Sequence, residues 1–212
     1  MICIALGSLT YEECLRAVQA LPFAEIRLDL LELSREQVAA IFAANANLVA
    51  TCRAGKFTDD ERRALLVQAI NNGAAYVDVE VDASDAFKDA VIQAAKARRT
   101  KIIISYHDFE KTPERAELEH LLRWCGEFTP DIIKIACMVH SARDNARLLG
   151  LLDTDTPMIV VGMGEQGKIS RVVSPLIGSV FTFASYAEDK ATAPGQLFKD
   201  DIEDIINRIN HL

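Results

Sequence analysis

Short apolar segments recur along the chain, separated by longer segments that mix apolar and polar residues. Each apolar segment is rich in isoleucine and valine, a pattern typical of buried β-strands, and the segments repeat roughly every 25 residues. We predict eight strands, at Ile2–Leu6, Glu25–Leu30, Leu48–Arg53, Tyr76–Val81, Lys101–His107, Ile132–Ala136, Met158–Met163 and Val180–Ser185.

The segments between these strands have helical spacing of apolar residues, and several begin with a residue that favours a helix N-terminus. These start signals are Thr10, Ser34, Thr58 with Glu61 as a capping box, Thr112 with Pro113 at the first helical position, and Ser141. Strands and helices are therefore predicted to alternate to the end of the chain.

Eight successive βα units favour an α/β fold of the (β/α)8 TIM barrel type, with eight parallel strands and short loops. A doubly wound open sheet is also compatible with the alternation alone. No change of composition, linker or low-complexity segment divides the chain, so we expect residues 1–212 to form a single barrel domain. The active site of such a barrel lies where the strands end.

Composition and charge narrow the function. The 212 residues are 50% hydrophobic, enough for a sizeable core, and the formal net charge of −8 without a basic cluster disfavours binding of nucleic acid. The opening MICIALGS is too short and lacks the basic flank of a signal peptide, and no apolar run is long enough to span a membrane. We expect a cytoplasmic protein without a membrane partner.

The cysteines do not indicate a disulfide or a metal site. They are odd in number, scattered and without a CxxC pair, and the four histidines do not join them in a ligand cluster. The five are Cys3, Cys14, Cys52, Cys125 and Cys137. Three of them, Cys3, Cys52 and Cys137, fall within apolar strand-like runs, and we interpret these as small hydrophobic core residues in preference to catalytic thiols.

Two predicted strands carry charged residues on one face. In EIRLD, residues Glu25, Arg27 and Asp29 alternate with apolar residues, and Asp78 and Glu80 do so in YVDVEV. In a barrel the apolar face meets the helices, so the charges point inward, where they must be paired or functional. The pattern indicates a polar site, although a structural ion-pair network or a solvated edge strand would give the same pattern.

Lys134 lies among isoleucines in DIIKIACM, in a segment otherwise suited to complete burial. An apolar environment lowers the pKa of a lysine and makes it a nucleophile for Schiff-base formation with a ketone. His107 ends the preceding strand in KIIISYHDF, where it could serve as the base beside an imine. The alternatives are a lysine paired with a carboxylate at the strand end and a histidine bonded to Asp108.

The segment GMGEQGKIS matches GxGxxG and nearly matches a phosphate-binding GxxxxGK[ST] loop. The second pattern needs a hydroxyl where Ile169 stands, and the first should be followed by several strands where only one remains. Nucleotide binding is therefore disfavoured. Backbone amides of such a loop, with Arg171 close behind, suit a small anion such as a carboxylate.

Together these motifs resemble type I 3-dehydroquinate dehydratase, the Schiff-base-forming enzyme of the shikimate pathway, over essentially the whole chain. EIRLD resembles the second-strand motif of that family, TCR its third-strand arginine, SYHDF its histidine strand and IIKIACM its lysine strand. GMGEQGKISR and TAPGQ resemble its last two loops, and all six motifs keep the chain order of the family.

The resemblance implies a (β/α)8 barrel that dehydrates 3-dehydroquinate to 3-dehydroshikimate, the third step toward chorismate and aromatic amino acids, without cofactor or metal. It implies that Lys134 forms the imine, His107 acts as general acid and base, and Arg171 pairs with the substrate carboxylate. The remaining substrate-binding residues implied by the motifs are Glu25, Arg27, Arg53, Thr192 and Gln196. The resemblance also suggests a homodimer.

Two positions depart from the family pattern. Many members have a glutamate four residues after the third-strand arginine that can orient the histidine, and this chain has Phe57 there. We hypothesise that Glu80 or a water takes part of that role. Thr192 stands where a serine is common, which retains the hydroxyl.

Two other functions stay open at this point. A class I aldolase would use the same lysine chemistry, but it usually has to stabilise a phosphate, and only the Gly164–Gly167 loop offers an additional anion site. A non-catalytic barrel protein that kept the pocket and lost turnover through the change at Phe57 would bind ligand without forming product.

Overall fold

The computed structural model of the protein describes residues 1–211, in which eight strands alternate with eight α-helices. The strands are β1 (Ile2–Leu6), β2 (Ala24–Arg27), β3 (Leu48–Thr51), β4 (Tyr76–Glu80), β5 (Lys101–Asp108), β6 (Ile132–Met138), β7 (Met158–Met163) and β8 (Thr182–Ser185). The helices are α1 (Tyr11–Ala20), α2 (Arg35–Ala44), α3 (Asp59–Asn71), α4 (Asp85–Arg98), α5 (Arg115–Gly126), α6 (Ala142–Leu149), α7 (Lys168–Val173) and α8 (Lys199–Asn210).

The order of strands in the sheet confirms the predicted fold class. The order is β7-β6-β5-β4-β3-β2-β1-β8, which follows the chain with β8 next to β1. The pairs β1–β2, β2–β3, β3–β4 and β6–β7 are parallel. A doubly wound sheet reverses its order at a switch point, whereas this cyclic order is that of a (β/α)8 barrel. The open-sheet alternative is therefore excluded.

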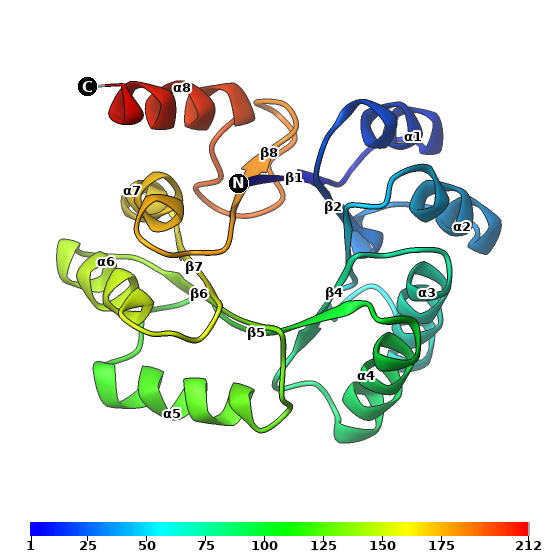
Figure 1. Ribbon diagram of the computed structural model, residues 1–212, viewed down its shortest axis with the longest axis horizontal. Coiled ribbons are helices and arrows are strands. Elements are labelled where there is room, and N and C mark those ends of the chain that lie inside the picture. The colour runs from blue at the N-terminus through cyan, green and yellow to red at the C-terminus, as the bar shows by residue number, and fades with distance from the viewer. Residues whose placement is uncertain (212) are drawn as a thin grey trace. The chain divides into compact units, whose positions relative to one another are not determined.

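The chain divides into two compact units, and the first spans Ile4–Ile103. In this unit, helices α1 to α4 follow one another along the outer side of strands β2 to β4 (Figure 1). The register pairs Arg27 with Thr51 and Thr51 with Asp78, so three polar residues from neighbouring strands lie side by side. Apolar side chains of the helices cover the other face of these strands.

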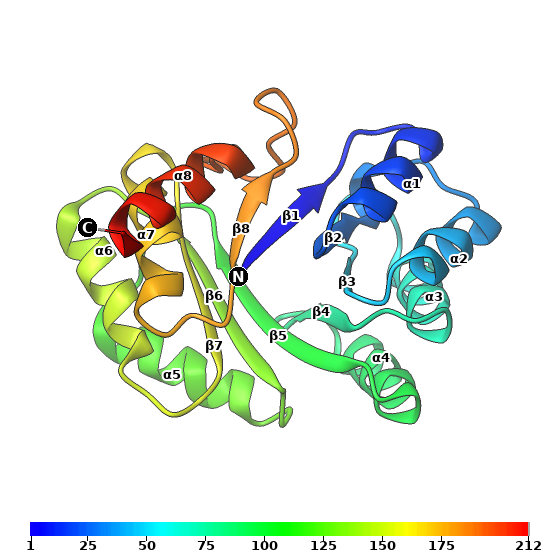
Figure 2. The ribbon, with the colours of Figure 1, turned by 45° about the horizontal axis from the view of Figure 1, so that its top comes forward.

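The second unit combines Met1–Cys3 with the chain from Ile104 onward. It contains most of β5, all of β6 to β8 and helices α5 to α8, with α7 in contact with α8 (Figure 2). Every residue of β7 and β8 is buried. The expectation of a single domain stays a prediction.

Most helix starts follow the predicted signals. Thr10, Ser34 and Thr58 each accept a hydrogen bond from the third residue of their helix and form complete capping boxes, and Ser141 caps α6. The prediction at Thr112 was wrong, because α5 begins at Arg115. The Thr112 hydroxyl instead donates to the carbonyl of Met138 at the end of β6, at 2.7 Å.

The second strand ends earlier than predicted. β2 stops at Arg27, and Leu28–Leu30 form a 3-10 turn. The turn brings the Asp29 carboxylate back to the Arg27 guanidinium, with Nη2 and Oδ2 2.6 Å apart. Asp29 therefore lies outside the strand, in the turn that follows it, and contacts the charged face of β2 through its ion pair with Arg27.

All five cysteines are buried and reduced, and the core interpretation of Cys3, Cys52 and Cys137 is confirmed. Burial raises the pKa of three of the thiols to about 12, those of Cys14, Cys52 and Cys137.

Candidate active site

Lys134 lies in the middle of β6 and is 5% exposed. Its neighbours Ile133 and Ile135 are buried, and its Nζ atom lies 4.4 Å from the centroid of the Phe183 ring on β8. A cation over an aromatic face is attracted to it electrostatically. Lys134 is therefore a mid-strand residue in an apolar environment, not a lysine at the exposed end of a strand.

His107 is half-buried near the end of β5, the neighbour of β6 in the sheet. Its ring stacks on Phe109, with centroids 6.1 Å apart and an interplanar angle of 15°. One carboxylate oxygen of Asp108 accepts the backbone N–H groups of Glu110 and Lys111, both at 2.9 Å, and so closes the turn that follows. The imidazole and the amine thus come from adjacent strands, as predicted. The other histidines, His120, His140 and His211, are exposed.

Arg171 on α7 is 1% exposed, and burial lowers its pKa to about 10. Its Nη1 donates to the carbonyl of Phe183 at 3.4 Å and its Nη2 to that of Pro194 at 3.1 Å. Within residues 1–211 no carboxylate pairs with it, and its buried Nε has no hydrogen-bond partner. A buried cation without a counter-ion is a strong site for an anionic ligand.

Glycines in the loops after β7 and β8 allow these two loops to approach closely. The N–H of Gly164 donates to the carbonyl of Pro194 at 3.2 Å. A Cβ atom on Gly195, which has φ +68°, would lie 2.2 Å from the carbonyl oxygen of Gly164. This packing accounts for glycine at these positions without a nucleotide. In the same loop Gln196 Oε1 accepts the backbone N–H of Thr192 at 2.7 Å and its hydroxyl at 3.1 Å.

In the unit Ile4–Ile103, two predicted site residues lie on β2. Glu25 is 4% exposed and accepts the hydroxyl of Thr51 at 2.8 Å. Arg27 forms a two-point interaction with Asp29. Burial lowers the pKa of Arg27, but the Asp29 hydrogen bond and the charge of Glu25 outweigh burial and raise it.

Arg53 follows β3 and donates to both carboxylate oxygens of Asp78, at 2.8 and 2.7 Å. Its Nη1 also lies 3.7 Å from a carboxylate oxygen of Glu80. Burial lowers the pKa of Arg53, and the charges of Asp78 and Glu80 raise it by more. The charged strand residues thus form ion pairs with one another. The alternative interpretation of the pattern, a structural ion-pair network, also predicts such pairs.

Sequence reasoning did not single out Thr51, Phe183 or Arg62. Arg62 on α3 is 3% exposed and donates to Glu80 at 3.0 Å. One signal for it was available, because Arg62 is in helical phase with the buried Leu66 and Ala69. A charged residue on the apolar face of a helix requires a buried partner.

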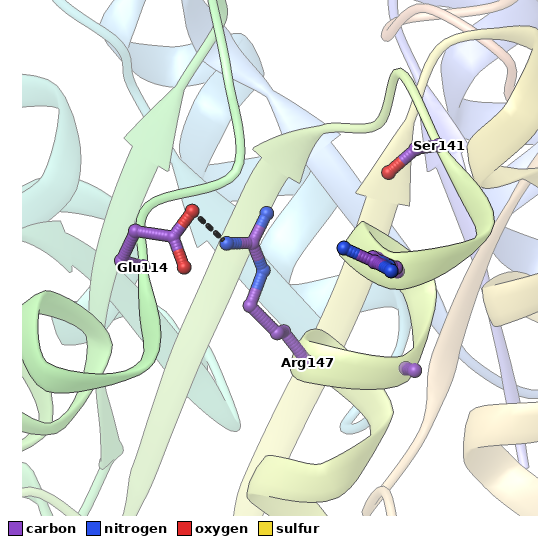
Figure 3. A pocket seen from close by; sticks show the side chains of 5 residues that line it. Glu114, Ser141 and Arg147 are labelled. Atoms are coloured by element: carbon purple, nitrogen blue, oxygen red, sulfur yellow. Dashed lines mark ion pairs between the residues drawn. The ribbon is translucent and has the colours of Figure 1, made fainter.

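Arg147 of α6 links that helix to the residue that precedes α5. Arg147 forms one ion pair with Asp144 and another with Glu114, the residue that precedes α5 (Figure 3). A cavity of about 410 Å³ is lined by Glu114, Ser141, Arg143, Ala146 and Arg147. The Glu114 ion pair therefore connects the start of α5 to the last turn of α6, and these helices follow the strands of His107 and Lys134.

In the part of the chain that the structure describes, no helix is long and apolar enough to cross a membrane. The same residues contain no cluster of three or more histidine, cysteine, aspartate or glutamate side chains that could hold a metal ion.

Comparison with known proteins decides the family. The family model of type I 3-dehydroquinase matches residues 2–212. The chain belongs to the type I 3-dehydroquinase family. It is 34% identical over 220 residues to 3-dehydroquinate dehydratase of Methanococcus vannielii, with 99% of this chain and 100% of the relative covered. The enzyme of the same name from Methanocaldococcus jannaschii is 32% identical over 217 residues, with 97% of each chain covered.

Solved structures agree with this assignment. Type I 3-dehydroquinate dehydratase from Clostridium difficile, solved with covalently modified comenic acid, has a TM-score of 0.85 at 26% identity and covers 99% of this chain and 92% of its own. The enzyme from Aquifex aeolicus has a TM-score of 0.80 at 27% identity, with both chains fully covered. This member of the type I 3-dehydroquinase family is therefore a hydro-lyase of the 3-dehydroquinate dehydratase type. A 3-hexulose-6-phosphate synthase with a TM-score of 0.55 and 17% identity shares the fold alone.

Proposed function

We propose that this chain converts 3-dehydroquinate to 3-dehydroshikimate through an imine on Lys134, with His107 as general acid and base. The reaction would be the third step of the shikimate pathway toward chorismate. The observation that carries the proposal is the burial of Lys134 in mid-strand beside the strand that bears His107. The covalently modified ligand in the C. difficile enzyme supports covalent chemistry in the family.

The steps use only these two side chains and water. The neutral amine of Lys134 attacks the C3 ketone, and loss of water forms the protonated imine. His107 removes a proton from C2, and the electron pair moves into the imine to give an enamine. The enamine electrons return and expel the C1 hydroxyl, which leaves as water with a proton from His107. A second water hydrolyses the imine and releases the product and the amine.

The charged residues have distinct roles in this proposal. Arg171 pairs with the substrate carboxylate, and the absence of a counter-ion for it within residues 1–211 supports that role. The ring hydroxyls contact the polar side chains of the other motif residues, which are Glu25, Arg27, Arg53, Thr192 and Gln196.

The residue that orients His107 stays a prediction. Phe57 replaces the family glutamate, and we propose that Glu80 or a water contributes instead. The Glu80 carboxylate already binds Arg62 and lies close to Arg53. If Glu80→Gln left the turnover and its pH profile unchanged, the Glu80 version of this hypothesis would be wrong.

The imine can be trapped. We expect incubation with 3-dehydroquinate and borohydride to give a stable mass increase on the peptide that contains Lys134. Lys134→Ala should lose the adduct, and Lys168→Ala should keep it, because Lys168 is a more exposed lysine paired with Glu165. Absence of an adduct together with absence of dehydroshikimate would overturn the proposal, and cleavage of sugar phosphates would favour an aldolase.

Three further properties stay predictions: a homodimer, which the family resemblance suggests, and a cytoplasmic location and a single domain over residues 1–212, which rest on the sequence patterns. Light scattering coupled to gel filtration would test the first, and cell fractionation the second. A single unfolding transition seen by both fluorescence and circular dichroism would support the third.

A further inference from the structure

Arg62 is a buried arginine in the first turn of α3, and all three of its side-chain nitrogens donate hydrogen bonds. Nε donates to the carbonyl of Cys52, Nη1 to Asp59 and Nη2 to Glu80, each at 3.0 Å. The guanidinium carbon also lies 4.6 Å from the centroid of the Phe87 ring. The side chain is 4% exposed, so these contacts take the place of water.

The position is unfavourable for a cation unless its partners compensate. A positive charge in the first turn of a helix opposes the helix dipole, and burial of an ion costs several kcal/mol. The neighbouring Arg63 avoids the cost of burial, because its side chain is 43% exposed and pairs with the exposed Asp60. The two neighbouring arginines therefore differ in burial, and only the buried Arg62 needs several partners to compensate for the loss of water.

Two of these contacts reach the environment of Arg53. The Cys52 carbonyl belongs to the residue directly before Arg53, at the end of β3. The Glu80 carboxylate binds Arg62 through Oε2, while its Oε1 lies 3.7 Å from Nη1 of Arg53. Arg62 thus restrains both the backbone that carries Arg53 and a carboxylate beside its guanidinium. Asp78 holds the same guanidinium through two hydrogen bonds.

We infer that Arg62 is a positioning residue for Arg53, acting through the Cys52 carbonyl and Glu80. The inference rests on the proposed function, in which Arg53 contacts a substrate hydroxyl. A planar guanidinium can bond a carbonyl and two carboxylates at fixed angles, whereas a lysine ammonium cannot reproduce that arrangement. Loss of the three hydrogen bonds of the Arg62 guanidinium allows Arg53 to shift. Small displacements of a binding group reduce the rate strongly.

A double-mutant cycle on kcat/KM tests the inference. We expect Arg62→Lys to lower kcat/KM about tenfold in the otherwise unchanged enzyme, mainly through a higher KM. In the Arg53→Gln background the same change should cost less than about twofold, because the group that it positions is gone. Arg63→Lys is the matched control on the same helix turn, and its kcat/KM should equal that of the unchanged enzyme.

The coupling distinguishes positioning from a role in stability alone. A purely structural arginine would give the same loss in both backgrounds, and that result would overturn the inference. So would an Arg53→Gln variant with unchanged kcat/KM. If Arg62→Lys does not fold, the cycle of Glu80→Gln with Arg53→Gln replaces it, with the same expected coupling. Glu80→Gln effects that add to those of Arg53→Gln would then overturn the inference.

Borohydride trapping separates this inference from the proposed function. If Arg62→Lys keeps the Lys134 adduct and its loss of kcat/KM is smaller in the Arg53→Gln background, the proposed function and the positioning role both stand. If it keeps the adduct and its losses are additive, the proposed function stands and the positioning role fails. An unchanged enzyme with neither adduct nor turnover would overturn the proposed function and this inference with it.

Discussion

Replacing Arg171 with methionine should leave the ligand-free protein as stable as before or slightly more stable, although the residue is 1% exposed. Burial lowers the pKa of Arg171 to about 10, roughly 2.5 below its ordinary value. At about 1.4 kcal/mol for each pKa unit, the charged guanidinium carries about 3 kcal/mol of uncompensated desolvation. Methionine has a similar stem and no charge, so the substitution removes this cost.

The substitution also removes two hydrogen bonds, to the carbonyls of Phe183 and Pro194. Each contributes about 1 kcal/mol, so the net expectation is a gain of about 1 kcal/mol in the free energy of unfolding. Arg53→Met is the matched comparison, because it leaves the carboxylate of Asp78, whose side chain is fully buried, without its two-point partner. The Arg53→Met substitution should lower the free energy of unfolding by about 3–5 kcal/mol.

Urea denaturation of the two variants and of the unchanged protein measures the difference in their free energies of unfolding. Both variants should lose activity, while only Arg53→Met loses stability. Saturating substrate should raise the melting temperature of the unchanged protein more than that of Arg171→Met, because the substrate carboxylate supplies the missing counter-ion. The reasoning is refuted if Arg171→Met destabilises the protein as much as Arg53→Met does.

Three further outcomes are expected. Gly195→Ala should lower both the melting temperature and kcat/KM, because its Cβ would lie 2.2 Å from the Gly164 oxygen, whereas Gly126→Ala meets no atom within 4 Å and should be neutral. Thr58→Ala should cost about 1 kcal/mol in urea unfolding with kcat unchanged, since Thr58 caps α3, while Ser84→Ala should cost less because Ser84 makes no cap bond. Native thiols should resist alkylation at pH 9 until urea is added, and their contribution to stability should be lost as the pH rises from about 9 toward 12, because the folded-state pKa is raised. The thiols concerned are Cys14, Cys52 and Cys137.

The eight strands and most helix starts could be predicted from the sequence because their causes are local. A strand such as β7, MIVVGM, needs only its apolar run, and a capping box such as Thr58 with Glu61 is complete within four residues. The early end of β2 was missed because the apolar alternation continues through Leu28 and Leu30, which lie in a 3-10 turn. At Thr112 the predicted cap was wrong because its hydroxyl bonds to Met138, 26 residues away.

Some features of the candidate site could likewise be predicted from the sequence, and others could not. The residue types alone marked Lys134 and His107, since a lysine or histidine in an otherwise apolar strand is conspicuous in any fold. Their adjacency followed from the order of the strands. Partners such as Asp78 for Arg53 and Glu80 for Arg62 could not be foreseen, because each depends on register and packing between separate elements.

The sequence by itself determined the alternation of strand and helix, the chemistry available at the strand ends and the family to which the chain belongs. Only the tertiary structure decided that Arg53 pairs with the buried carboxylate of Asp78, that Arg171 has no counter-ion in residues 1–211 and that Arg62 donates to Glu80. The physical reason is that secondary structure follows from local sterics and patterning. The ionisation and position of a buried charge follow instead from desolvation and from partners that folding brings together.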